Sequence, residues 1–217
     1  MGKKKAKKKI PWRAAVREAM WAAAKKEAAR RYGDSNPPFN YRWEHVTAIV
    51  TLAVKLAEMT GADRDVVEAA AWLHDIRKDA GDDHPREGAK FARDFLPQTD
   101  FPKKKIARVA QAIEDHMGLW RDKPLTNLES QVLWDADKLS KIGLTAAFHW
   151  IGNDLSKGKP RATADFIRRG RSAGWQKKTV ASMHTKPAKK AARARLKAFN
   201  RLWDDLETEL NGDDLAA

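Results

Sequence analysis

Cysteine is absent from the 217 residues, so the chain can form neither a disulfide nor a thiolate metal site. Any metal must be bound by histidine, carboxylate and water, a ligand set that suits Mn, Fe, Co, Ni, Mg or Zn. No apolar run approaches the ~18 residues that a membrane span needs. The lysine-rich residues 1–10 lack the apolar stretch that follows the charged start of a signal peptide. We therefore expect a soluble, cytoplasmic protein that has no membrane partner.

The net charge of +14 is distributed unevenly along the chain. Residues 1–31 contain twelve Lys or Arg and two acids, and residues 156–201 contain fifteen Lys or Arg and one acid. The middle, residues 32–155, is mildly acidic, and residues 202–217 contain six acids and no base. Because contacts with nucleic acid are largely electrostatic, the two basic flanks could bind it, whereas the middle of the chain does not favour such a role.

Helical spacing dominates the apolar pattern, and Pro and Gly fall between the periodic segments. The pattern predicts an all-α fold with a polar loop over 77–83 and an irregular basic stretch over 156–182. The predicted helices span about 12–31, 41–60, 63–75, 85–95, 102–118, 127–143, 145–155 and 186–210. We expect a basic tail and helix over 1–38, a helical domain over 39–210 and a short tail over 211–217.

Imidazole and carboxylate groups occur at unexpected places in this pattern. His45 lies beside the apolar face of a helix, and the pair His74-Asp75 ends an apolar helix. His116 ends another helix, and Asp137 lies among apolar residues of a further one. Burial of such groups costs free energy unless they are paired or bind a metal. Groups from several helices could meet at one metal in the core of a bundle.

The order of these residues resembles the HD superfamily of metal-dependent phosphohydrolases. The segments that carry the resemblance are YRWEHV, AAAWLHDIRK and WDADKLSKIG. Two others, HPREGAKFA and QAIEDH, resemble the extra histidine segments of members with two metals, and MHTKPAKKAARARLKAF resembles the C-terminal helix of small bacterial members. The resemblance covers about residues 39–210 and implies an HD-type helical bundle with a metal site in its core.

The resemblance also implies a ligand set for two divalent ions. The first ion would be bound by His45, His74, Asp75 and Asp137. The second would be bound by His84 and His116, with Asp75 as the bridge. Paired metals lower the pKa of a shared water and neutralise the phosphoryl oxygens of an ester.

Lys78 resembles the lysine of an HDIGK-like motif, where it would steady a phosphate or a leaving group as a point charge. Arg77 replaces the glycine of that motif. Asp75 and Lys78 are therefore the catalytic candidates. If only one metal binds, Asp79 becomes a candidate general acid or base.

The function expected from this set is hydrolysis of a phosphomonoester or phosphodiester, with a phosphorylated small molecule such as a nucleotide as substrate. One alternative is an HD-fold di-iron oxygenase, because such enzymes use four histidines and two aspartates in the same order. Another is a nucleic-acid-binding protein with a structural HD core.

The remaining candidates have weaker support. Trp43 and Trp120 lie near the expected ligands and could line a base-stacking pocket. His149 is expected to pack between aromatic neighbours, and packing is also the favoured interpretation of His184. Asp135, like Asp115, is expected to lie on the surface or to orient a ligating imidazole.

Overall fold

The computed structural model describes residues 9–121, 123–159 and 161–216, and helices dominate them. The α-helices are α1 (Trp12–Tyr32), α2 (Tyr41–Thr60), α3 (Arg64–Leu73), α4 (His84–Phe95), α5 (Ile106–Asp115), α6 (Leu128–Leu139), α7 (Leu144–Ser156), α8 (Thr163–Arg171), α9 (Trp175–Ala181) and α10 (Lys186–Asn211). Short 3₁₀ segments cover Lys78–Asp83, Leu96–Gln98, Lys103–Lys105 and Asp213–Ala216. The predicted all-α fold is confirmed. None of the described helices combines the length and apolar character needed to cross a membrane.

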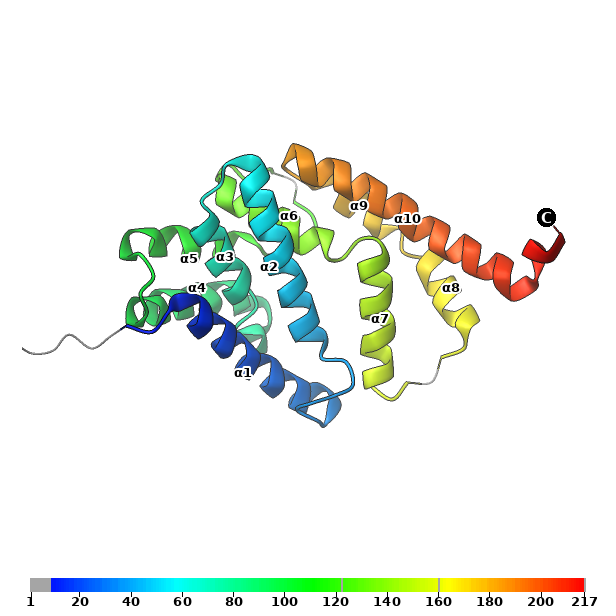
Figure 1. Ribbon diagram of the computed structural model, residues 1–217, viewed down its shortest axis with the longest axis horizontal. Coiled ribbons are helices and arrows are strands. Elements are labelled where there is room, and N and C mark those ends of the chain that lie inside the picture. The colour runs from blue at the N-terminus through cyan, green and yellow to red at the C-terminus, as the bar shows by residue number, and fades with distance from the viewer. Residues whose placement is uncertain (1–8, 122, 160, 217) are drawn as a thin grey trace, which may run out of the picture.

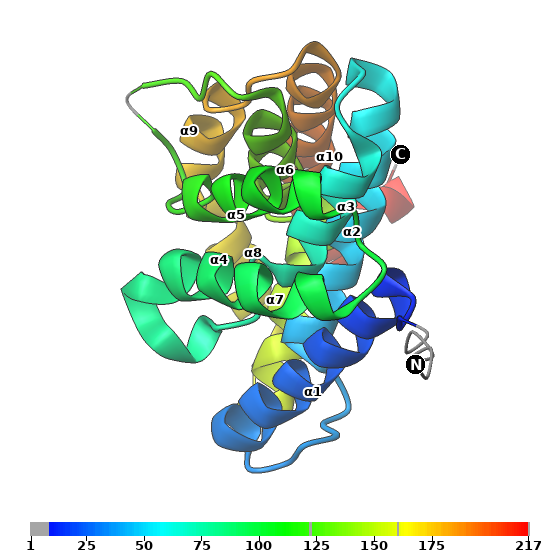
Figure 2. The same ribbon diagram turned by 90° about the vertical axis from the view of Figure 1, so that its left-hand side faces the viewer.

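The helices form a bundle that is widest around α2 and α3 (Figure 1). α2 packs on α3 and α6, while α5 contacts α3, α4 and α6. α1 lies across α2 and α3, and the end-on view shows α4 and α5 stacked in front of them (Figure 2). α10 contacts α6 and α7 and carries α8 and α9 against it. The first six α-helices therefore surround one interior, and the later helices extend the bundle to one side.

The main core lies between α1 and α6 and extends to the start of α10. In α1, Val16, Met20 and Ala24 recur every four residues and are fully buried. This spacing places them on one face of the helix, which packs against the rest of the bundle. A second, smaller core joins α7, α8 and α10, and it contains Phe199 and Trp203. Burial along α1 shows that this helix is part of the main core.

The sequence prediction was wrong for the stretch 156–182, which contains the two short helices α8 and α9. α8 is nine residues long and includes Gly170, a residue that weakens a helix in isolation. Gly170 is buried against the ring of Trp203, and a Cβ atom at this position would overlap that ring. The helix thus depends on a close approach to α10, which the local sequence does not reveal.

Several boundaries also differ from the prediction, and the helix expected over 127–143 already ends at Leu139. The expected loop over 77–83 is mostly a 3₁₀ segment, in which Gly81 adopts a φ of 61° that L side chains rarely adopt. The helix expected over 102–118 is the α-helix α5, preceded by a 3₁₀ turn and ending at Asp115. The α-helix therefore ends just before His116, which is free to point out of the helix end.

Candidate metal centre

Six of the side chains that the sequence singles out meet in the middle of the bundle. They are His45 in α2, His74 and Asp75 directly after α3, His84 at the start of α4, His116 directly after α5, and Asp137 in α6. None of these residues is more than 4 % exposed. These polar groups can occupy the interior together because each has the others as polar neighbours.

The carboxylate of Asp75 lies between two pairs of histidines. Its Oδ2 is 3.6 Å from Nε2 of His45 and 3.5 Å from Nε2 of His74. Its Oδ1 is 3.3 Å from Nε2 of His84 and 3.7 Å from Nε2 of His116. The site therefore contains two groups of potential metal ligands that share one carboxylate.

Asp137 lies beside the first group, on α6. Its Oδ1 is 3.4 Å from Nε2 of His45. One turn further along α6, the hydroxyl of Ser140 donates to the carbonyl of Asp137 at 2.7 Å. The hydroxyl oxygen of Ser140 is also 3.2 Å from Nδ1 of His45 and can accept a hydrogen bond from it. Through these contacts α6 fixes the ring of His45.

Backbone carbonyls fix the other three histidine rings in the same way. In each case Nδ1 donates to the carbonyl three residues earlier, at 2.8 Å for His74, 2.6 Å for His84 and 2.5 Å for His116. A carbonyl can only accept a hydrogen bond, so Nδ1 carries the proton and Nε2 keeps its lone pair. All four rings consequently direct an Nε2 atom toward the carboxylate of Asp75, which is the tautomer that metal ligation requires.

The donor set fits a bound cation. Nε2 of His84 and Nε2 of His116 are only 3.2 Å apart, although both are acceptors. Lys78 places a positive charge at one of them, with its Nζ atom 2.9 Å from Nε2 of His84. Nε2 of His74 is buried and has no hydrogen-bond partner among the described residues. Divalent ions would satisfy these lone pairs together with the two carboxylates.

Positive charges surround the two carboxylates. Arg42 is buried and joins Glu27 of α1 to Oδ2 of Asp75. Burial alone would raise the pKa of Asp75, but the guanidinium of Arg42 holds it well below its usual range. Asp75 is therefore an anion at neutral pH, as a bridging ligand must be.

Asp137 is held in the same state by Lys138 of α6 and by Lys141, which follows the end of this helix. Lys138 is fully buried and contacts Oδ2, and Nζ of Lys141 is 2.9 Å from Oδ1. Burial alone would raise the pKa of Asp137, but these lysines hold it well below its usual range. Burial lowers the pKa of Lys138 to about 8, against the opposing effect of Asp137.

Burial keeps His45, His74 and His84 neutral. It lowers the pKa of His74 to about 4 and that of His45 well below its usual range. The pKa of His84 is lowered by burial and by the neighbouring Lys78. Neutral imidazole is the form that binds a metal ion, so neutral pH requires no proton release from these rings before ligation.

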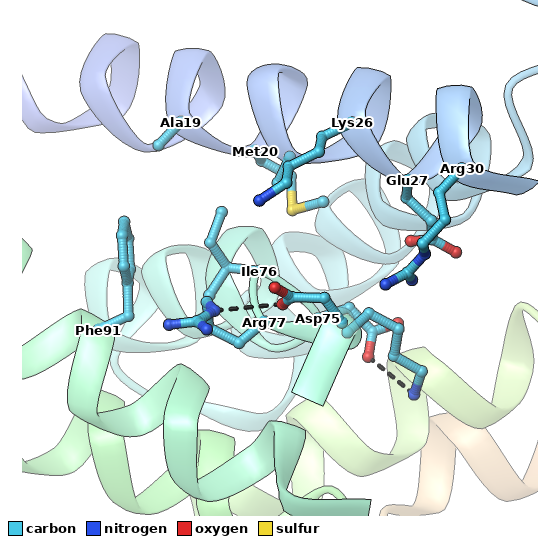
Figure 3. Close-up of a pocket in the computed structure, with 12 residues that line it drawn as sticks. Ala19, Met20, Lys26, Glu27, Arg30, Asp75, Ile76, Arg77 and Phe91 are labelled. Carbon is cyan, nitrogen blue, oxygen red and sulfur yellow. Dashed lines mark hydrogen bonds and ion pairs between the residues drawn. The ribbon is translucent and has the colours of Figure 1, made fainter. Parts of the chain in front are cut away.

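Two cavities meet at this centre. One, of about 370 Å³, is lined by His84, His116, Asp137 and Lys141 among other residues. The other, of about 580 Å³, lies between α1 and the segment from Asp75 to Asp79 (Figure 3). Asp75 and Lys78 line both cavities, and Nζ of Lys78 is 3.2 Å from Oδ1 of Asp75.

The other sequence candidates lie outside this cluster. Asp79 is exposed and pairs with Arg77. Trp43 packs against Trp21 and Trp72, and Trp120 is exposed beside Lys178, so neither lines the two cavities at the centre. The ring of His149 packs near Phe39 and Tyr41.

Three of these candidates have structural contacts. His184 accepts a hydrogen bond from the backbone of Leu125 at 2.9 Å. Asp115 is half-buried and accepts one from Ser130 at 2.7 Å. Asp135 is fully buried, which excludes the surface alternative, and it accepts hydrogen bonds from the amides of His184 and Thr185, directly before α10.

Several residues of the site were missed by the sequence reasoning. They are Glu27, Arg42, Lys138, Ser140 and Lys141. For Ser140 and Lys141 a signal was available, because they follow Asp137 at three and four residues within the helix expected over 127–143, a spacing that brings side chains together. Lys138 follows at one residue, a spacing that gives no such signal. Arg42 precedes His45 by three residues, also on one helix face. Glu27 gives no such signal, since its contact with Arg42 joins two different helices.

The fold and the site together define an all-α protein with a buried centre of histidine and carboxylate. Residues 42–142, which include all six central residues, match the family model of the HD domain. This part of the chain is therefore an HD domain, as the resemblance of its motifs implied.

Solved structures share the fold along nearly the whole chain. A predicted HD superfamily hydrolase from an uncultured Thermotogales bacterium has 24% identity and a TM-score of 0.63, over 93% of this chain and 94% of that one. YpgQ of Bacillus subtilis in complex with ADP has 21% identity and a TM-score of 0.61, over 90% and 98%. An HD-superfamily hydrolase from Bacillus thuringiensis has 18% identity and a TM-score of 0.63, over 91% and 97%. No curated protein matches the sequence.

Proposed function

We propose that the chain is a metal-dependent hydrolase of phosphoric esters. The observation that carries the proposal is the carboxylate of Asp75, whose two oxygens face separate pairs of histidines. The ligands of one divalent ion would be His45, His74, Asp75 and Asp137. Those of a second would be Asp75, His84 and His116. Such ions supply Lewis acidity that activates water and offsets the charge of a phosphoryl group.

The protein's own side chains have three tasks in this proposal. Backbone carbonyls and Ser140 hold the imidazoles so that Nε2 points inward. Arg42 and Lys138 keep the two carboxylates ionised while excluded from water. Lys78 and Lys141 line the cavity beside the centre, where their ammonium groups can orient the oxygens of a phosphate. Lys78 is thus proposed to contact the substrate directly.

A nucleotide is the substrate class that we propose. YpgQ, which shares the fold over 90% of this chain, was solved in complex with ADP. The cavities beside the centre contain cations for the phosphates and apolar side chains for the rest of such a molecule. These features favour a phosphorylated small molecule as substrate over a small molecule that lacks phosphate.

Nucleic acid is a second candidate partner, supported by the exposed side of α10. Lys186, Lys190, Arg193 and Lys197 recur on one face of this helix and are all exposed. No ion pair joins them to another residue in the part of the chain that the structure describes. RNA and DNA therefore belong in the same substrate test.

The test is a panel of nucleoside mono-, di- and triphosphates, phosphodiesters, RNA and DNA, assayed with Mn, Fe, Co, Ni, Mg and Zn. We expect phosphate or nucleotide release with at least one metal. His74→Ala should reduce this rate by about 100-fold or more, because loss of a residue that only orients a metal ligand already costs about 10- to 100-fold. His149→Ala, a histidine outside the centre, should leave it nearly unchanged. Survival of activity in His74→Ala would refute the site.

The same panel separates the oxygenase alternative. Its signature is oxygen consumption by protein that contains about two iron ions, with no release of phosphate from any ester. That result would replace the hydrolase proposal while leaving the six-ligand centre in place.

Glu27 provides a further prediction, because it anchors the arginine that contacts the bridging carboxylate. It accepts hydrogen bonds from Arg42 at 2.7 and 3.2 Å. Glu27→Gln is expected to weaken the binding of Mn²⁺ by about tenfold, since outer partners orient the ligands. Calorimetric titration with Mn²⁺ measures this effect. Glu18→Gln, an exposed change on the same helix, should have no effect, and equal affinities in both variants would contradict the role of Glu27.

A further inference from the structure

The larger of the two cavities is built in part by a helix outside the matched HD segment. α1 supplies Met20, Lys26 and Arg30 to its lining, and the segment after His74 supplies Asp75 to Asp79 (Figure 3). Asp75 and Lys78 also line the smaller cavity, so the two cavities adjoin at these side chains.

The C-terminal half of α1 contributes positive charge to this cavity. Lys26 and Arg30 are one helical turn apart, and both extend toward the segment that carries Asp75 (Figure 3). No ion pair joins either of them to a residue in the described ranges. The acids of the same lining have partners, because Glu27 pairs with Arg42 and Asp79 with Arg77. Two cations are therefore available to an anionic ligand.

Another part of the lining is apolar, and it too includes residues of α1. Met20, Ile76 and Phe91 contribute to it, together with Ala19 and Ala23. A volume of about 580 Å³ is within the range of cavities that enclose small organic ligands. The combination of free cations and an apolar wall, in a cavity that adjoins the centre, suits a ligand with an extra phosphate and an apolar part.

Building on the proposed function, we infer that this cavity binds the non-reacting part of a nucleoside polyphosphate. Lys26 and Arg30 bind a phosphate other than the one at the centre, and the apolar wall contacts the base. These two residues of α1 thereby determine specificity, since a nucleoside monophosphate has no second phosphate for them to bind.

Equilibrium binding tests this inference without turnover. The probes are the thiophosphate analogues of ADP and AMP, which are hydrolysed slowly, titrated into the metal-loaded protein in a calorimeter. We expect the diphosphate to bind at least about tenfold more tightly than the monophosphate, because its second phosphate makes charge-assisted hydrogen bonds with Lys26 and Arg30. In the double variant Lys26→Gln/Arg30→Gln this ratio should fall to about two or less. Both residues are exposed, so the fold should tolerate the changes, and a thermal unfolding curve verifies this.

The matched control is Lys25→Gln/Lys55→Gln, which removes the same charge from positions that do not line the cavity. It should keep the wild-type ratio. A ratio near one in the wild type, an unchanged ratio in the Lys26/Arg30 variant, or an equal loss in the control would overturn the inference. If the protein hydrolyses phosphoric esters but gives any of these three results, the α1 subsite is rejected and the proposed function stands. If the binding ratios are as expected but the protein hydrolyses no phosphoric ester, the proposed function is rejected and the α1 subsite stands.

Discussion

Replacing Asp75 with asparagine is expected to abolish the binding of both metal ions and to reduce ester hydrolysis by about 1,000-fold or more. Asparagine has nearly the same shape, so the change removes mainly the negative charge that faces both histidine pairs. Two divalent ions that share one anionic bridge cannot both be retained without it. Metal content after dialysis, measured by mass spectrometry, should fall from about two ions per chain to less than one.

Two comparisons make this result specific. Asp79→Asn changes a carboxylate only four residues away, but this residue is exposed and pairs with Arg77, so metal content should stay unchanged. His84→Ala removes a ligand of the second group alone and should leave about one ion bound. If Asp75→Asn retains two ions, the bridging role is wrong. If His84→Ala loses both, the two groups do not bind independently.

Asp135→Ala is expected to destabilise the fold by about 3 kcal/mol or more, which corresponds to a fall in Tm of roughly 10 °C. The carboxylate of Asp135 is fully buried and accepts hydrogen bonds at 2.8 Å from the amides of His184 and Thr185. It also accepts one at 2.7 Å from the hydroxyl of Thr185. Alanine would leave these buried donors unsatisfied and would release the start of α10 from α6.

The control for this prediction is Asp94→Ala on α4. Asp94 is exposed, so its removal should change stability by no more than about 0.5 kcal/mol. Thermal unfolding followed by circular dichroism gives both values. Equal Tm values for the two variants would show that Asp135 does not anchor α10. The Tm of Asp135→Asn should lie between the Tm values of Asp135→Ala and Asp94→Ala, because an amide keeps one acceptor oxygen.

The sequence was sufficient to predict the helical class and the residues that meet at the centre. Helical spacing of apolar residues is a local property, and the helices from 41 to 60 and from 186 to about 210 were located almost to the residue. The grouping of His45, His74 and Asp137 was also visible, because each imidazole or carboxylate interrupts an apolar segment. Whether these residues bind metal stays a prediction.

The missed features depend on contacts between distant segments. α8 contains a glycine that becomes favourable only because Trp203 of α10 occupies the space beside it. Glu27 looks like any solvent-facing acid of an amphipathic helix until Arg42 is placed next to it. The role of Asp135 is equally hidden in the sequence, because its hydrogen-bond partners lie about fifty residues later, directly before α10. Periodicity cannot reveal such pairings, since it describes only the face on which a residue lies.

The link from Glu27 through Arg42 to Asp75 has a consequence for how this chain can change during evolution. Two acids that share one buried arginine tolerate its loss poorly, because both Glu27 and Asp75 would then lose a positive partner. Glu27 lies on α1, while Arg42 belongs to the matched HD segment. We therefore expect positions 27 and 42 to covary among relatives of this chain, so that lineages that replace the arginine also lose the acid on α1.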